Sequence, residues 1–449
     1  MSFQIATAKT DITPRPGANP YMAGYGVQSA LRTVASDSPH SSPLFARCVV
    51  LWDDGAPHAI VSVDILGIPR SVHQGLRPRL IELADWASSD VVLVATHTHN
   101  GPVVGESLDP FIAYDLVDFD LVHQYTAWLQ DSIVDLVSAT LSATRTQVTL
   151  DYRVTTMNFS RNRAGLSTVE TAVPVVTARR SNGAPHAVLF SYGSHPVSAG
   201  WQEQWDGDFP AGAATVIENQ TGAFALFLPG PAGDQDPLGV RGWALRADHS
   251  QALGGAVASA AQSSGRSLAG PIASQIREVQ LPLEITPTPD NLAAVRAAFI
   301  TRMGNPLGQP ATYQRHAEAM IARIDAGLYD VTVPNPSQVW RIGGDPALKM
   351  AFVGGELVSG YGAYFRARHG GTNALYIGGY ANEVDCYIPA DNFLPPLGPS
   401  WGSYEGGWDS DYPGIAGGSM TVYPHIAHFR AGAGGAEAAV ISALSAQLS

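Results

Sequence analysis

The stretch Val91-Val92-Leu93-Val94-Ala95-Thr96-His97-Thr98-His99-Asn100-Gly101-Pro102 decides how the rest of the chain is interpreted. Its first five residues are apolar, as in a buried strand, and the Gly-Pro pair ends that strand. Residues two apart on a strand face the same side, so His97 and His99 are expected to point to one place beyond the strand end. Neutral imidazole is a common metal ligand and a proton carrier near neutral pH. The stretch therefore predicts a chemical site here, with a polar strand-end loop as the alternative.

Composition indicates a globular protein and excludes several partner classes. The chain has 449 residues, 45% hydrophobic and 14% charged, and a net charge of −13. There is no excess of lysine and arginine to neutralise phosphates, so we expect neither nucleic acid nor an anionic membrane surface as a partner. No apolar run approaches the ~18–20 residues that cross a bilayer. A small molecule is the expected partner.

Cysteine usage and the start of the chain give an expectation for the compartment. Cys48 and Cys386 cannot form a disulfide framework in a chain of this length. The first residues show no basic segment followed by an apolar one, so no secretory signal is expected. A cytoplasmic location is the simplest fit.

Apolar runs and segments of helical periodicity alternate along the chain. The expected strands are 46–52, 59–66, 91–95, 148–155, 187–191, 223–228, 339–342 and 351–353. The expected helices are 72–87, 121–141, 210–219, 244–262, 291–303, 313–326, 357–368 and 436–447. This alternation predicts an α/β or α+β layered fold. We expect one domain over 1–449, with a possible helical insertion at 282–335.

Other chemistry-bearing segments follow expected strands or lie in loops. They are Ser194-His195-Pro196, Gly233-Asp234-Gln235-Asp236-Pro237, Gly354-Gly355-Glu356, Asn382-Glu383-Val384-Asp385-Cys386-Tyr387 and Tyr404-Glu405-Gly406. Each alone has an ordinary structural explanation, such as a core histidine, a solvated turn or a carboxylate at a helix start.

Together and in this order, these segments resemble the catalytic domain of the neutral ceramidases. Thr96–Pro102 matches that family's His-Thr-His-Ser-Gly-Pro hallmark, with Asn100 in place of serine. The resemblance implies a four-layer α-β-β-α sandwich, without the family's C-terminal immunoglobulin-like domain because the chain ends at Ser449. It also implies one zinc ion per chain, with four ligands: His97, His195, Glu356 and Tyr387. Imidazole, carboxylate and phenolate are all suitable zinc ligands.

The resemblance also implies roles for residues around the metal. His99 would shuttle protons, Tyr404 would donate to the developing oxyanion, and Arg163 would assist. Where ceramidases carry Gly-Asp-Val-Ser-Pro, this chain has Asp236 at the serine position. The expected substrate-binding residues are Asp236, Asp234, Trp201 and Trp408. Carboxylates beside aromatic rings favour a hydroxyl-rich or cationic substrate group.

These features predict a zinc-dependent hydrolase that cleaves an amide (N-acyl) bond with a metal-activated water, on a substrate other than ceramide itself. One alternative is a zinc hydrolase of an ester, a lactone or a carbohydrate-linked group. Another is a non-catalytic relative that binds a metal or ligand, since fold does not fix function. A Ser-His-Asp hydrolase is disfavoured because there is no Gly-x-Ser-x-Gly elbow.

Overall fold

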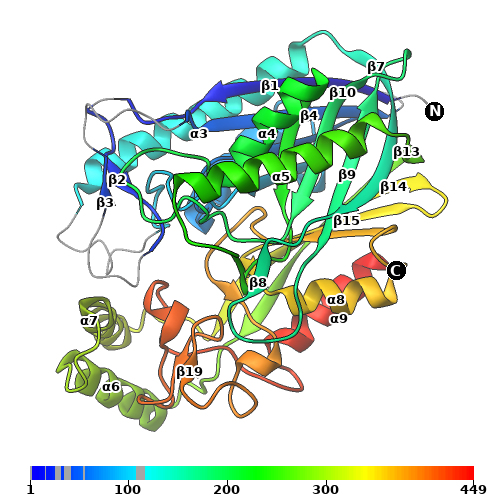
Figure 1. Ribbon diagram of the computed structural model, residues 1–449. Helices are drawn as coiled ribbons and strands as arrows, with labels where there is room; N and C mark the ends of the chain where they lie inside the picture. The colour runs from blue at the N-terminus through cyan, green and yellow to red at the C-terminus, as the bar shows by residue number, and fades with distance from the viewer. Residues whose placement is uncertain (1–2, 16, 26–31, 35–41, 54–55, 108–116) are drawn as a thin grey trace.

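Two layers of β-strands lie face to face in the computed structural model, which describes residues 3–15, 17–25, 32–34, 42–53, 56–107 and 117–449 (Figure 1). The first layer has the order β1 (Phe3–Asp11), β4 (Phe45–Asp53), β5 (Ala56–Val63) and β6 (Val91–Ala95). The second begins with β11 (Phe224–Pro229), β10 (Pro185–Tyr192), β9 (Ala172–Arg179) and β7 (Thr146–Thr156). It continues with β13 (Arg266–Pro282), β14 (Thr332–Gly344), β15 (Leu348–Val353) and β17 (Leu375–Gly378).

Strand β7 belongs to both layers. Its first residues pair with β1, and the rest of the strand pairs with β9 and β13. The inward side chains of both layers form one apolar cluster, in which Ile5, Val92 and Val94 of the first layer pack with Leu189, Leu226 and others of the second. Burial of this cluster removes apolar surface from water and holds the sheets face to face.

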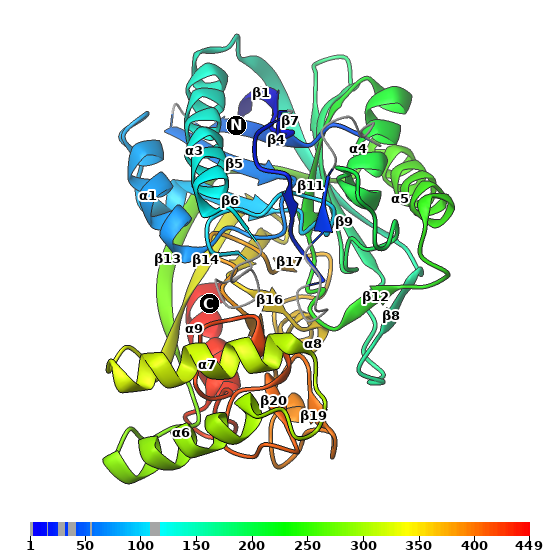
Figure 2. The same cartoon turned by 90° about the vertical axis from the view of Figure 1, so that its left-hand side faces the viewer.

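Helices cover the outer faces of both layers. Figure 2 shows α1 and α3 on one side of the paired sheets and α4 and α5 on the other. The helices are α1 (Arg70–Ile81), α3 (Phe119–Ser142), α4 (Asp208–Thr221), α5 (Trp243–Gln262), α6 (Pro289–Met303), α7 (Ala311–Asp325), α8 (Ser359–Arg368) and α9 (Ala436–Leu448). Separate apolar clusters join α1 and α3 to the first layer, and α4 and α5 to the second. The four-layer α-β-β-α sandwich is therefore confirmed.

The short elements gather mainly in loops around the strand ends. They are β2 (Tyr21–Met22), β3 (Arg32–Thr33), β8 (Ser160–Asn162), β12 (Gln235–Pro237), β16 (Glu356–Leu357), β18 (Tyr387–Ile388), β19 (Gly402–Ser403) and β20 (Trp408–Asp409), with single 3-10 turns at 88–90, 391–393 and 418–421. Along the chain, helices α6 and α7 come between β13 and β14. Helices α6 to α9 appear together at the lower end of Figure 2. No helix among the described residues is long and apolar enough to cross a membrane.

Parallel strand pairs determine where loops converge. Parallel pairing joins β5 to β6, β10 to β11, and β15 to β17, and the connections contain α1, α4 and α8 respectively. In such units the loops after the strands collect at one edge of the sheet, where ligands bind in α/β proteins. The segments that contain His97, His195 and Glu356 follow β6, β10 and β15.

Most expected elements are present, with differences at some boundaries. The helix expected over 72–87 ends at Ile81, and Asp85 beyond it has a left-handed φ of 51°. Strands β1, β9 and β13 were not among the sequence expectations. Pro174 within β9 and the charged residues of β13 mask the usual strand pattern.

Asn382 connects both sheets and helix α1 at a fully buried position. Its backbone N–H donates to the carbonyl of Leu93, and its side-chain oxygen accepts from Arg77 at 2.5 Å. Its side-chain nitrogen donates to Gln338 of β14 at 3.0 Å. Asn382 also has a φ of 63°, a left-handed conformation that asparagine tolerates better than most residues.

We expect Asn382→Ala to lower the free energy of unfolding by about 2–4 kcal/mol, because it leaves buried donors without partners. Urea unfolding measures this change. Asn219→Ala, at an exposed position of α4, is the matched control and should change stability by less than about 0.5 kcal/mol. Equal stability of the two variants would contradict the role given to Asn382.

Candidate metal centre and its pocket

His97 lies in a turn rather than on a strand. Strand β6 ends at Ala95, and His97 has a left-handed φ of 68°. Its backbone N–H donates to the carbonyl of Ile65, and its ring Nδ1 lies 2.6 Å from the carbonyl oxygen of Leu66. The alternation argument for His97 and His99 was therefore wrong about the backbone. The two Nε2 atoms nevertheless lie 3.3 Å apart, because the turn brings the rings together.

The next three residues come from the second sheet and its loops. His195 follows β10, and its Nδ1 lies 2.7 Å from the carbonyl oxygen of Ala232. Glu356 and Tyr387 are direct partners in the parallel pair β16–β18. This pairing places a carboxylate and a phenol side by side, although the two residues are far apart in the sequence.

The donor atoms of these residues converge on one point. Oxygen Oε2 of Glu356 lies 3.1 Å from Nε2 of His97 and 3.1 Å from Nε2 of His195. The hydroxyl of Tyr387 lies 3.3 Å from Nε2 of His195. Two ligands with bonds of ~2.0–2.1 Å to a tetrahedral zinc ion are about 3.3 Å apart. The separations and the mixed nitrogen and oxygen donors fit a zinc-type ion.

Electrostatics favour the protonation states that a metal site needs. Burial lowers the pKa of His195, and the nearby Arg163 adds to this effect, so the imidazole is neutral. Burial alone would raise the pKa of Glu356, but contact with His97 and His195 holds it well below its usual range. Burial raises the pKa of Tyr387 well above its usual value, while Arg163 acts in the opposite direction. A neutral His195 imidazole and an ionised Glu356 carboxylate are ready to accept a cation.

His99 belongs to the same cluster but has a different environment. Among the described residues, the side chains of His97, His99 and His195 form a group that could hold a metal ion, with ligand atoms within 4.8 Å of one another. The Nδ1 atoms of His97 and His195 face backbone carbonyls, as expected for metal-binding histidines, whose outer nitrogen is usually fixed by a partner. The Nδ1 of His99 has no such partner in the described part of the chain.

Gly24 allows the ring of His99 to occupy this position. A Cβ atom on Gly24 would lie 2.6 Å from Nδ1 of His99, and the φ of Gly24 is 80°. The ring of Tyr25 packs edge-on against His99 with 5.0 Å between centroids. His99 is therefore held by packing.

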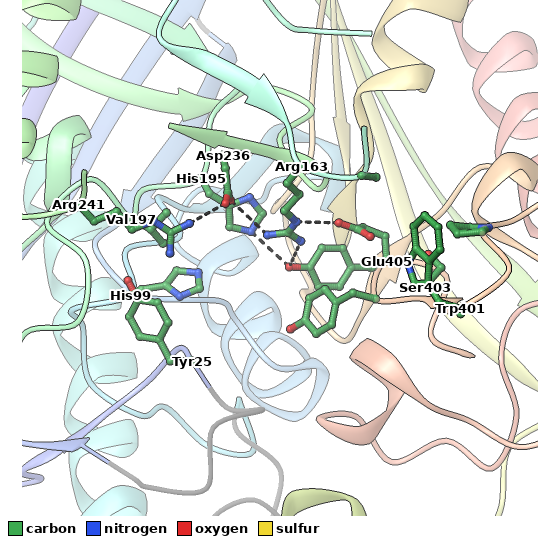
Figure 3. A pocket seen from close by; sticks show the side chains of 15 residues that line it. Tyr25, His99, Arg163, His195, Val197, Asp236, Arg241, Trp401, Ser403 and Glu405 are labelled. Carbon is green, nitrogen blue, oxygen red and sulfur yellow. Dashed lines mark hydrogen bonds and ion pairs between the residues drawn. The ribbon is translucent and has the colours of Figure 1, made fainter. Parts of the chain in front are cut away.

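A pocket of about 440 Å³ opens beside this cluster. Its lining includes aromatic, charged and small side chains: Tyr25, His99, Arg163, Ala164, His195, Val197, Asp236, Arg241, Tyr387, Pro399, Trp401, Gly402, Ser403, Tyr404 and Glu405. Figure 3 shows Arg163 between Asp236 and Glu405. Arg163 donates to Glu405 at 2.7 Å and to the Tyr387 hydroxyl at 3.0 Å.

Of the four expected substrate-binding residues, two lie at the pocket and two do not. Asp236 lines the pocket, and Trp201 packs against the pocket residue Tyr25 with 5.6 Å between ring centroids. Asp234 and Trp408 are not among the lining residues. The Asp234 carboxylate accepts hydrogen bonds from Asn162 and from Ser359, and the Trp408 indole donates to the Phe393 carbonyl. Asp234 and Trp408 thus hold neighbouring segments together by hydrogen bonds and do not line the pocket.

Several residues at the site carried no usable sequence signal. Tyr380 packs against His97 with 4.4 Å between ring centroids, and the Tyr423 hydroxyl donates to Oε1 of Glu356 at 3.4 Å. Tyr25 and Arg241 line the pocket from distant loops. The relation of these four residues to the site depends on tertiary packing, which local sequence patterns do not show.

The chain matches solved structures in fold. The structure of a neutral ceramidase from Pseudomonas aeruginosa superposes with a TM-score of 0.63 at 17% identity, covering 94% of this chain and 72% of that chain. The structure of a ceramidase complexed with C2 superposes with a TM-score of 0.62 at 17% identity, covering 94% and 73%. No protein-family model and no curated protein sequence matches the chain. The chain therefore has the fold of the neutral ceramidases.

Proposed function

We propose that this protein is a zinc-dependent hydrolase of an amide (N-acyl) bond, with one metal ion per chain held by His97, His195, Glu356 and Tyr387. The observation that carries the proposal is the sharing of one Glu356 oxygen by two imidazole nitrogens at 3.1 Å. The structural likeness to ceramidases, which are named for an amide substrate, supports the choice of bond.

The residues around the proposed metal have separate tasks. When bound, the ion would polarise the scissile carbonyl and lower the pKa of a water molecule. His99 would accept and return a proton at Nε2, which faces the cluster. The Tyr404 hydroxyl would donate to the oxygen that becomes negatively charged. Arg163 would hold the Tyr387 oxygen and favour its phenolate form.

The pocket lining supports a substrate other than ceramide. Val197, Ala164 and Pro399 are its aliphatic members, and the other lining residues are aromatic, charged or small. A long acyl or sphingoid chain needs continuous apolar surface to be removed from water. A short or polar N-acyl compound fits this lining better.

Chelation should abolish hydrolysis, and added zinc should restore it. Metal analysis of the active protein should give about one zinc ion per chain, because the donor set closes around one point. The assay is a hydrolysis screen of short N-acylated amines and N-acylated amino sugars. A metal-free preparation that keeps full activity would overturn the proposal.

His97→Ala and His195→Ala should weaken zinc affinity by more than about 100-fold, since partners behind the ligands alone account for about 10–100-fold. His99→Gln should keep the metal and lose on the order of 10²–10⁴ in kcat, as expected for removal of a proton carrier. Metal titration and steady-state kinetics distinguish the two classes. His123→Gln, an exposed change on α3, is the control. Loss of zinc from His99→Gln would make His99 a ligand instead.

Tyr404→Phe should lower kcat by about 10²–10³ while leaving zinc content unchanged, because one oxyanion donor is removed. The matched control is Tyr364→Phe, on α8 and outside the pocket lining. An unchanged kcat in Tyr404→Phe would remove this tyrosine from the proposed machinery.

A further inference from the structure

Asp236 is surrounded by positive charge. Its carboxylate lies 2.6 Å from Arg241, 3.4 Å from Arg163 and 3.6 Å from Arg161. Burial opposes ionisation, but these arginines, led by Arg163, hold the pKa of Asp236 below its usual value. One carboxylate is therefore shared by three guanidinium groups. Arg163 also forms an ion pair with Glu405. Within this cluster, the acidic partner of Arg241 is Asp236.

Among the described residues, the guanidinium of Arg241 uses few of its N–H donors, and its backbone is held in place. Within the described structure its guanidinium donates to Asp236 through one nitrogen, although the group carries five N–H donors. Its side chain is 37% exposed and lines the pocket. The neighbouring Gly242 N–H donates to the Ser198 carbonyl at 2.8 Å, and Gly200 packs so closely that a Cβ would lie 2.9 Å from Cβ of Arg241.

Arg241 lies near the reacting groups. Arg163 bridges Asp236, the partner of Arg241, to the hydroxyl of Tyr387. Figure 3 shows Arg241 and His99 at one end of the pocket and Trp401 at the other. A substrate group held by Arg241 would therefore lie in the same pocket as the proposed ligands His195 and Tyr387.

We propose that Arg241 binds a carboxylate of the substrate, so that the substrates are amides with a carboxylate close to the scissile bond, such as N-acyl amino acids. This inference rests on the proposed amide hydrolase function. It revises the expectation of a hydroxyl-rich or cationic substrate group, because the Asp236 carboxylate is already paired with arginines. A guanidinium group with unused, coplanar donors matches a carboxylate in charge and geometry.

Calorimetric titration of the metal-free protein tests the inference without a contribution from metal–carboxylate binding. The first probe pair is N-acetylalanine and its neutral amide, with the carboxylate on the amine side. The second pair is N-butylsuccinamic acid and N-butylbutyramide, with the carboxylate on the acyl side. At least one acid should bind about tenfold or more tighter than its neutral partner, as for a charge-assisted hydrogen-bonded pair.

Variants of the cluster should shift the preference for the acid probe over its neutral partner in opposite directions. Arg241→Gln should remove the preference, and Arg241→Lys should keep part of it. Asp236→Asn should increase it, because the competing carboxylate charge is lost. Arg296→Gln, at an ion pair between α6 and α7, is the control and should leave the preference unchanged. Equal binding of acid and neutral probes to the unmodified protein, or a preference that survives Arg241→Gln, would overturn the inference.

The same probes separate this inference from the proposed function. Hydrolysis of amides without a carboxylate preference would overturn the Arg241 subsite alone. A preference that depends on Arg241, without hydrolysis by the zinc-loaded protein, would overturn the hydrolase and leave the carboxylate subsite standing.

Discussion

Burial of the apolar layer between the two sheets determines where chemistry can occur in this fold. The layer holds the carboxyl ends of β6 and β10, which belong to different sheets, close enough for their following histidines to touch. Neither sheet alone supplies the site, because His97 comes from one and His195 from the other. The two sheets also share β7, so this relative placement is fixed by hydrogen bonds as well as by packing.

A buried carboxylate between two imidazoles is costly unless its charge is compensated. Glu356 is 4% exposed and has Tyr423 as an additional hydrogen-bond donor. The backbone around it is strained as well: Tyr25, His97, Tyr380 and Asn382 all have left-handed φ values. Such conformations persist where the surrounding structure imposes them, and they concentrate at functional sites.

The sequence allowed prediction of most long elements, because apolar runs such as Val91–Ala95 and the periodicity of residues 121–141 are strong local signals. Motifs in the same order as in the neutral ceramidases were enough to predict the fold. They also predicted that His97, His195, Glu356 and Tyr387 belong to one site. The geometry itself was beyond local reasoning, since the left-handed turn at His97 replaces the expected strand. Tyr423 and Arg241 were missed for a similar reason: their relation to the site exists only after distant loops pack together.

The proposed ligands extend along the chain from His97 to Tyr387 and come from both sheets, which has a consequence for the timing of metal uptake. A growing polypeptide cannot assemble the donor set until Tyr387 has been synthesised and β18 has paired with β16. A metal ion held by all four proposed ligands would therefore bind only after segments from both sheets have come together. Such an ion would stabilise the native state, and the lifetime of the protein would then depend on metal supply.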